Sequence, residues 1–184
     1  MTSQEFNTIY SYHRPMLQFD GARQRPVLVA FSAVPGSGKS TLTSHLVNDF
    51  GFILVANKHV REAIDQAGFD PSVGSDYTLT LLNILTDDTQ PSIVLDRNID
   101  QWYEQIVLWC RQRKYELVVV RINVTYEILK RRIQARRPDD RDHTFEVLDF
   151  YLEQHALLGN SVAVSLELVD DFDLNESAQH IADF

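Results

Sequence analysis

The stretch Ala33-Val34-Pro35-Gly36-Ser37-Gly38-Lys39-Ser40-Thr41 decides the fold of this chain, and it follows the apolar run 27–31. It fits the P-loop pattern, in which a small residue and four spacers precede Gly-Lys-Ser between a strand and a helix. Gly36 and Gly38 permit backbone conformations closed to residues with a Cβ atom, so successive N–H groups can point at phosphate oxygens. A helix that begins near Gly38 adds its positive end to the same place. We therefore expect an anion-binding loop for a nucleoside triphosphate.

The side chains of this loop predict separate roles. We expect Lys39 to reach the β- and γ-phosphates and the Ser40 hydroxyl to bind Mg²⁺. Ala33 replaces the usual first glycine, which is tolerated because that position only closes the loop. The expected nucleotide-binding residues of the loop are Pro35, Gly36, Ser37, Gly38, Lys39, Ser40 and Thr41.

Length and composition limit the class of protein. A chain of 184 residues with 44% apolar residues predicts one globular domain, which we place at 26–184 after an N-terminal extension, 1–25, that packs on the core or on a partner. No apolar run approaches the ~18 residues of a membrane span, and the first residues lack a secretory pattern. The single cysteine, Cys110, fits a reducing cytoplasm and is expected to be a packed thiol.

The net charge of −9 bears on the partners. It argues against non-specific binding to a nucleic-acid backbone, because affinity there comes from lysines and arginines that displace counterions. A small-molecule substrate is favoured, although one basic channel could still hold a polynucleotide end.

Apolar runs and helix signals alternate after residue 26. Five strands separated by helices predict an α/β sandwich of three layers with a parallel sheet and right-handed crossovers. The strands are expected at 27–31, 52–56, 91–95, 117–122 and 162–169. Ligands bind such sheets at the carboxyl ends of the strands, so the P-loop, 57–61 and 96–98 should converge on one site.

Asp96 ends the apolar strand Ser92-Ile93-Val94-Leu95, an arrangement that holds Mg²⁺ in P-loop proteins through its water shell. We therefore expect Asp96 and Ser40 to share the metal. Arg97 and Asn98 follow directly, where they either face a ligand or cap the next helix, for which Asn98 and Asp100 are alternative N-caps.

The segment 130–141 holds six of the 17 basic residues of the chain. Arg132 and Arg136 are four residues apart and share a helical face, so they are candidates for a lid that closes over the nucleotide and neutralises charge during phosphoryl transfer. The alternative is a helix C-terminus at which cations are favoured and pair with nearby aspartates.

Together these motifs resemble the small P-loop kinases, which include gluconate kinases, adenylylsulfate kinases, zeta toxins, chloramphenicol phosphotransferases and polynucleotide 5′-kinases. The resemblance covers the chain from about Pro26 and rests on 33–41, 94–98 and 132–141. It implies the strand order 2-3-1-4-5, ATP with Mg²⁺ as cofactors, and transfer of the γ-phosphoryl group to a hydroxyl. Catalytic roles are then expected for Lys39, Asp96, Arg61, Arg132 and Arg136.

One departure from the family concerns the general base. Many members carry Asp-x-x-Arg after the second strand, whereas this chain has Lys58-His59-Val60-Arg61. Lysine cannot accept a proton unless burial lowers its pKa strongly. Four alternatives stay open: His59 substitutes, Asp96 serves both metal and acceptor, the acceptor differs, or turnover is feeble.

Two function classes follow. The first is an ATP-dependent kinase that acts on a small hydroxylated metabolite or a nucleotide. The second is a regulatory module or weak ATPase that holds ATP without efficient transfer. A GTPase is disfavoured because Asn57-Lys58 has no aspartate two residues further on, and a transporter ATPase is disfavoured because no Ser-Gly-Gly-Gln-like signature occurs.

Overall fold

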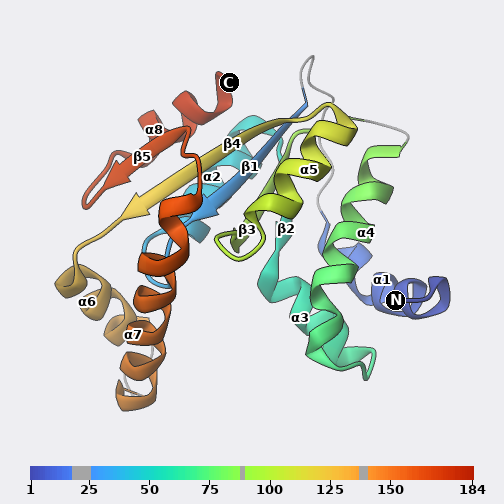
Figure 1. The fold of residues 1–184 in the computed structure, drawn as a ribbon, viewed down its shortest axis with the longest axis horizontal. Helices are drawn as coiled ribbons and strands as arrows, with labels where there is room; N and C mark the ends of the chain where they lie inside the picture. The colour runs from blue at the N-terminus through green and yellow to red at the C-terminus, as the bar shows by residue number, and fades with distance from the viewer. Residues whose placement is uncertain (18–25, 88–89, 137–140) are drawn as a thin grey trace.

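A computed structural model describes residues 1–17, 26–87, 90–136 and 141–184. Its centre is a five-stranded parallel sheet in the order β2-β3-β1-β4-β5, which confirms the predicted fold (Figure 1). The strands are β1 (Val27–Ser32), β2 (Ile53–Ala56), β3 (Ile93–Asn98), β4 (Glu116–Asn123) and β5 (Leu166–Val169). The described helices are α1 (Ser3–His13), α2 (Lys39–Phe50), α3 (Asn57–Gln66), α4 (Gly74–Asp87), α5 (Tyr103–Arg113), α6 (Tyr126–Arg136), α7 (Arg141–Leu158) and α8 (Leu174–Ala182).

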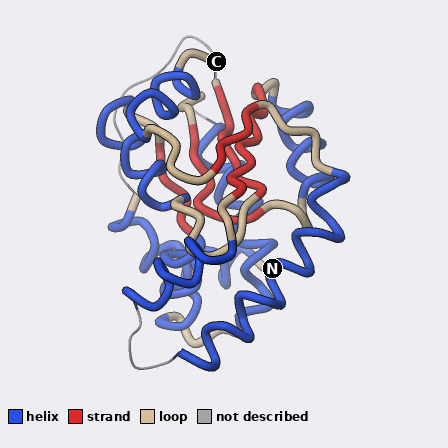
Figure 2. Tube along the Cα trace, turned by 90° about the vertical axis from the view of Figure 1, so that its left-hand side faces the viewer, coloured by secondary structure: helices blue, strands red, loops and turns tan. Residues whose placement is uncertain are grey.

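Helices cover both faces of the sheet, as Figure 2 shows. Side chains alternate along β1, so Leu28 and Ala30 meet the layer formed by α1, α3, α4 and α5, while Val29 and Phe31 meet α2 and α8. All six residues of β1 are buried, as expected for the central strand of a parallel sheet. The three layers thus fix the carboxyl end of β1, from which the P-loop begins.

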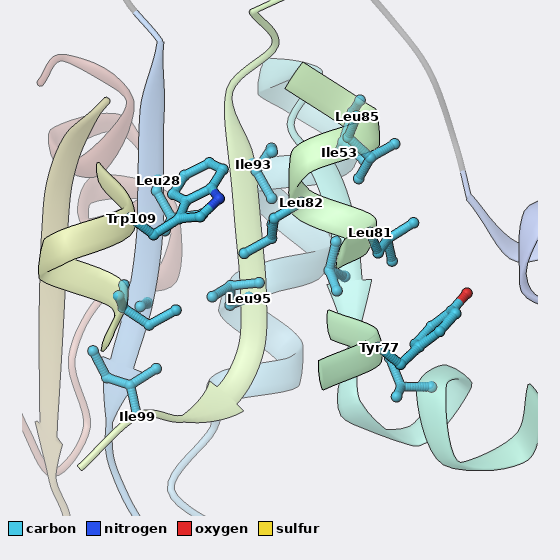
Figure 3. Close-up of a cluster of buried hydrophobic side chains, with 14 of the residues drawn as sticks. Leu28, Ile53, Tyr77, Leu81, Leu82, Leu85, Ile93, Leu95, Ile99 and Trp109 are labelled. Carbon is cyan, nitrogen blue, oxygen red and sulfur yellow. The ribbon is translucent and has the colours of Figure 1, made fainter. Parts of the chain in front are cut away.

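The larger core lies between the sheet and α4 and α5 (Figure 3). Leu82 of α4 and Leu28 and Ile93 of the sheet are fully buried there. Trp109 of α5 packs in the same cluster, and its Nε1 donates a hydrogen bond of 2.9 Å to Asn83 Oδ1. This core holds β3 in place up to Asp96.

Helix α1 lies in the segment interpreted as an extension. Thr2 and Glu5 form a reciprocal capping box at its start, and Phe6 and Ile9 are buried in the larger core. The ring of Phe6 stacks on Tyr77 of α4, with the ring centroids 5.2 Å apart. The helix therefore contributes to the core, and the domain boundary at residue 25 stays a prediction.

Several element boundaries differ from the predictions. Asn98 is the last residue of β3 and α5 begins only at Tyr103, with Trp102 as its N-cap, so neither Asn98 nor Asp100 caps this helix. The fifth strand is shorter than expected, Leu166–Val169. Helix α7 begins at Arg141, the last residue of the basic segment 130–141, of which 137–140 lie outside the described residues.

Within the ranges that the structure describes, no helix combines the length and the apolar character needed to cross a membrane.

Candidate nucleotide and acceptor site

The P-loop takes the conformation that its glycines permit. Gly36 and Gly38 have φ values of +83° and +108°, in the region that residues with a Cβ atom rarely adopt. A Cβ atom on Gly36 would lie 3.0 Å from Cγ1 of Ile133 on α6. Because Gly38 is the N-cap of α2, the positive N-terminal end of this helix lies at the loop.

Lys39 folds back on the loop. Its Nζ donates hydrogen bonds to the carbonyl oxygens of Val34 (2.7 Å) and Ala33 (3.2 Å). A phosphate oxygen bound in the loop would compete with these carbonyl oxygens for the ammonium group, since both are acceptors for the same donor.

Ser40 and Asp96 meet across the end of the sheet. The Ser40 hydroxyl donates a hydrogen bond of 2.8 Å to Asp96 Oδ2. A hydroxyl and a carboxylate are hard oxygen ligands of the kind that Mg²⁺ prefers. Among the described residues no group of three or more His, Cys, Asp and Glu side chains forms a metal cage. The pair therefore fits an Mg²⁺ ion that takes further ligands from water and nucleotide phosphates.

Helix α6 brings Arg132 onto the P-loop. Its Nη1 donates to the carbonyl oxygen of Ser37 (3.1 Å), and its Nη2 lies 3.7 Å from Asp171 Oδ1. The helix is held there because Leu129 and Ile133 pack with Val34. Arg136 ends this helix, but its side chain lies outside the described residues, so its role in a lid stays a prediction.

A cleft of about 440 Å³ opens between the P-loop and the loop after β5. Gly38, Thr41, Arg132 and Phe172 line it, and the Phe172 ring approaches within 3.6 Å of the place where a Cβ on Gly38 would stand. The sequence analysis missed Phe172, because no local signal marks a loop that reaches the site only through the strand order.

A cavity of about 260 Å³ lies against other residues of the same loop. Ala33, Pro35 and Lys39 form one wall, and the end of β3 with Asp96, Arg97 and Asn98 forms another. Trp102 and the α7 side chains Tyr151 and Gln154 complete it. The two cavities therefore share the P-loop as a common wall, with Lys39 and Asp96 on the side of the smaller one.

A hydrogen bond between the side chains of His155 and Asp100 supports this cavity. His155 Nδ1 of α7 lies 2.6 Å from Asp100 Oδ2, which also accepts a hydrogen bond of 3.1 Å from Asn98 Nδ2. Burial raises the pKa of Asp100, but the bonds to His155 and Asn98 outweigh it and hold the pKa below the usual value. The pair joins α7 to the segment after β3, and sequence reasoning did not find it because the partners are 55 residues apart.

Of the segment 57–61, which follows β2, only Asn57 lines this cavity. The Lys58 side chain is 80% exposed and its Nζ lies 3.6 Å from Glu62 Oε1, so this lysine sits in solvent. Arg61 is exposed and lines a separate hollow with Lys58 and Glu62. His59 does not line the cavity either, and its Nδ1 is buried with no hydrogen-bond partner among the described residues.

The start of α5 carries two aromatic residues, and Cys110 lies further along the helix. Trp102 and Tyr103 both pack against the larger core, and Trp102 also lines the smaller cavity. Cys110 is 3% exposed, and burial raises the pKa of its thiol to about 12, which confirms a packed, unreactive thiol.

No protein-family model matches the sequence, and no curated protein matches it significantly. Among solved structures, shikimate kinase from Acinetobacter baumannii in complex with shikimate is similar over 86% of this chain and 91% of its own, with a TM-score of 0.56 and 18% identity. The Mycobacterium tuberculosis APS kinase, solved with AMPPNP and APS, is similar over 88% of this chain and 98% of its own (TM-score 0.52, 17% identity). The PezAT toxin-antitoxin system of Streptococcus pneumoniae is similar over 94% of this chain and 80% of its own (TM-score 0.63, 11% identity). At these identities the likeness shows the fold that P-loop kinases share.

Proposed function

We propose that this protein is an ATP-dependent kinase that transfers the γ-phosphoryl group of MgATP to a hydroxyl of a small metabolite or nucleotide. The contact between Ser40 and Asp96 carries the proposal, because it joins a P-loop hydroxyl to a carboxylate at the end of the neighbouring strand. Lys39 and Arg132 contact the same loop, so four groups suited to a magnesium triphosphate lie together.

The cleft between α6 and the loop after β5 is the proposed place of the nucleotide base. It adjoins Gly36, Gly38 and Thr41 of the phosphate loop, and the Phe172 ring and the Arg132 guanidinium offer apolar and cationic surface to an aromatic base. A triphosphate that extends from this cleft along the loop would end near Lys39, at the border of the smaller cavity.

The smaller cavity is the proposed acceptor site. Lys39 and Asp96 both line it, so a hydroxyl held there stands beside the groups assigned to the γ-phosphate and the metal. Bound Mg²⁺ would neutralise charge on the β- and γ-phosphates. The side chains of Lys39 and Arg132 provide further positive charge, and the cavity walls fix the acceptor and limit the access of water.

The absence of a carboxylate at position 58 does not exclude transfer. Phosphoryl transfer through a loose transition state depends mainly on positioning and charge stabilisation. Asp96 is the partly exposed carboxylate of the acceptor cavity, which makes it our candidate to receive the acceptor proton. Two solved neighbours support a small acceptor, since they were solved with shikimate and with APS bound.

ATP consumption measured over a panel of hydroxyl compounds tests the proposal. We expect at least one compound to stimulate turnover in the wild type and the Lys39→Ala variant to abolish it. Lys58→Ala serves as the matched control, because this lysine is exposed and lies outside the acceptor cavity, and it should keep wild-type turnover. Turnover that survives the loss of Lys39 would refute the assignment.

The exposed position of Lys58 favours one alternative, an ATP-binding module without efficient transfer. Calorimetric binding of MgATP with no stimulation by any acceptor would support this alternative. Rapid phosphorylation of any acceptor would exclude it.

A further inference from the structure

Arg97 lies in the acceptor cavity without an ion pair to any residue that the structure describes. It follows Asp96 on β3, is partly buried and lines the cavity beside Trp102. Among the residues that the structure describes, none accepts a hydrogen bond from Arg97 and no carboxylate lies within 4.0 Å of its nitrogens, although the chain carries 26 acidic residues.

Trp102 fixes the orientation of this guanidinium. The Arg97 Cζ atom lies 3.3 Å from the centroid of the Trp102 ring, a cation–π contact that holds the guanidinium over the ring face. A guanidinium held by its face keeps its N–H edges available, and these form the planar fork that binds two oxygens of one anion.

Burial makes the missing counter-charge significant. An arginine stays protonated at neutral pH, and the partly buried guanidinium of Arg97 loses part of its hydration. A partly buried charge without an ionic partner is costly, and surface arginines avoid this cost by remaining in water. A ligand that supplies the anion would therefore bind more favourably, because the cation is already fixed in position.

The lining of the cavity brings this cation together with the transfer centre. Lys39 and Asp96, the groups proposed to face the γ-phosphate and the metal, line the same cavity as Arg97 and Trp102. A molecule that fills about 260 Å³ can offer a hydroxyl to the first pair and a second group to Arg97.

We propose that Arg97, held flat by Trp102, binds an oxyanion on the acceptor, so that the acceptor is a hydroxyl compound that carries a carboxylate or a phosphate. Arg97 is then a specificity-determining residue that selects charged over neutral hydroxyl compounds. This inference rests on the proposed function, because it assumes that the cavity holds the acceptor.

Calorimetric titration of the full chain tests the inference in two stages. The first stage titrates a non-hydrolysable ATP analogue with Mg²⁺, and absence of binding there overturns both proposals. The second stage titrates the nucleotide-loaded protein with ribose, ribonate, ribose 5-phosphate and inorganic phosphate. We expect ribonate or ribose 5-phosphate to bind at least tenfold more tightly than ribose, and the tighter of the two identifies the anion.

Variants of Arg97 complete the test. Arg97→Gln should lower the affinity for the charged probes at least tenfold and leave the affinity for the ATP analogue unchanged. Arg97→Lys keeps the charge but loses the fork, so it should recover part of this loss. Arg111→Gln, at an exposed position of α5, is the matched control and should bind all probes as the wild type does.

Three results would overturn the inference alone. They are nucleotide binding without binding of any charged probe, equal affinity for charged and neutral probes, and unchanged affinity for the charged probes in Arg97→Gln.

Discussion

Acidification should destabilise the protein through His13, the last residue of α1. Its side chain is fully buried, with 0% exposure, and its Nδ1 lies 2.9 Å from the Tyr77 hydroxyl. Burial lowers the pKa of His13 from 6.5 to about 4, and the neighbouring charge of His59 lowers it further in the same direction. The neutral form therefore belongs to the folded state, while the unfolded chain takes up a proton at higher pH.

The direction and size of the effect follow from this difference in pKa. Between pH 6.5 and about 4 the unfolded state binds more protons than the folded state, so the free energy of unfolding falls as the pH falls. A difference of about 2.5 pKa units corresponds to about 3 kcal/mol in full at low pH. The same relation gives a loss of about 2 kcal/mol between pH 7 and pH 5, before most carboxylates titrate.

Urea unfolding at pH 7 and pH 5, followed by circular dichroism, measures this loss. His13→Gln keeps a polar group near the Tyr77 hydroxyl but cannot titrate, so its stability should fall by about 2 kcal/mol less than that of the wild type. His180→Gln removes an exposed histidine of α8 and should follow the wild type. Equal losses in the wild type and His13→Gln would refute the reasoning.

Two further predictions concern the loop and the contact between Asp100 and His155. Gly36→Ala should lower the free energy of unfolding by more than the ~1–2 kcal/mol of left-handed strain, because its Cβ would also meet α6 at 3.0 Å. Gly68 has a φ of +74° and no heavy atom within 4 Å of its would-be Cβ, so Gly68→Ala measures the backbone strain alone. Equal losses of stability for the two variants in urea unfolding would contradict the packing argument. A double-mutant cycle with Asp100→Asn and His155→Gln should give a coupling of about 1–3 kcal/mol in the free energy of unfolding, whereas independent effects would show that the 2.6 Å contact contributes nothing.

Local patterns determined much of the fold. The apolar run of β1, the glycines and lysine of the P-loop, and the carboxylate after β3 are all readable within a few residues. Their convergence followed from the rule that ligands bind at the carboxyl ends of parallel strands. The structure places Ser40 and Asp96 in contact, as this rule leads one to expect.

The missed features depend on distant partners or on an overlooked cap. Thr2 and Glu5 show the capping-box spacing, which predicts a helix at the start of the chain and was available in the sequence. Asp100 is predicted to be a helix cap, but its carboxylate is bonded to His155 instead. His155 lies close enough only because α7 returns to the sheet, which no local pattern indicates. Phe172 likewise depends on the position of β5 at the sheet edge.

A crystal structure with a non-hydrolysable ATP analogue and Mn²⁺ tests the central claim most directly. We predict an anomalous peak for the metal between Ser40 Oγ and the Asp96 carboxylate, and Lys39 Nζ moved from the carbonyl oxygens of Ala33 and Val34 to the phosphates. A nucleotide bound elsewhere, or a loop in which Lys39 keeps both carbonyl bonds at saturating nucleotide, would contradict the account.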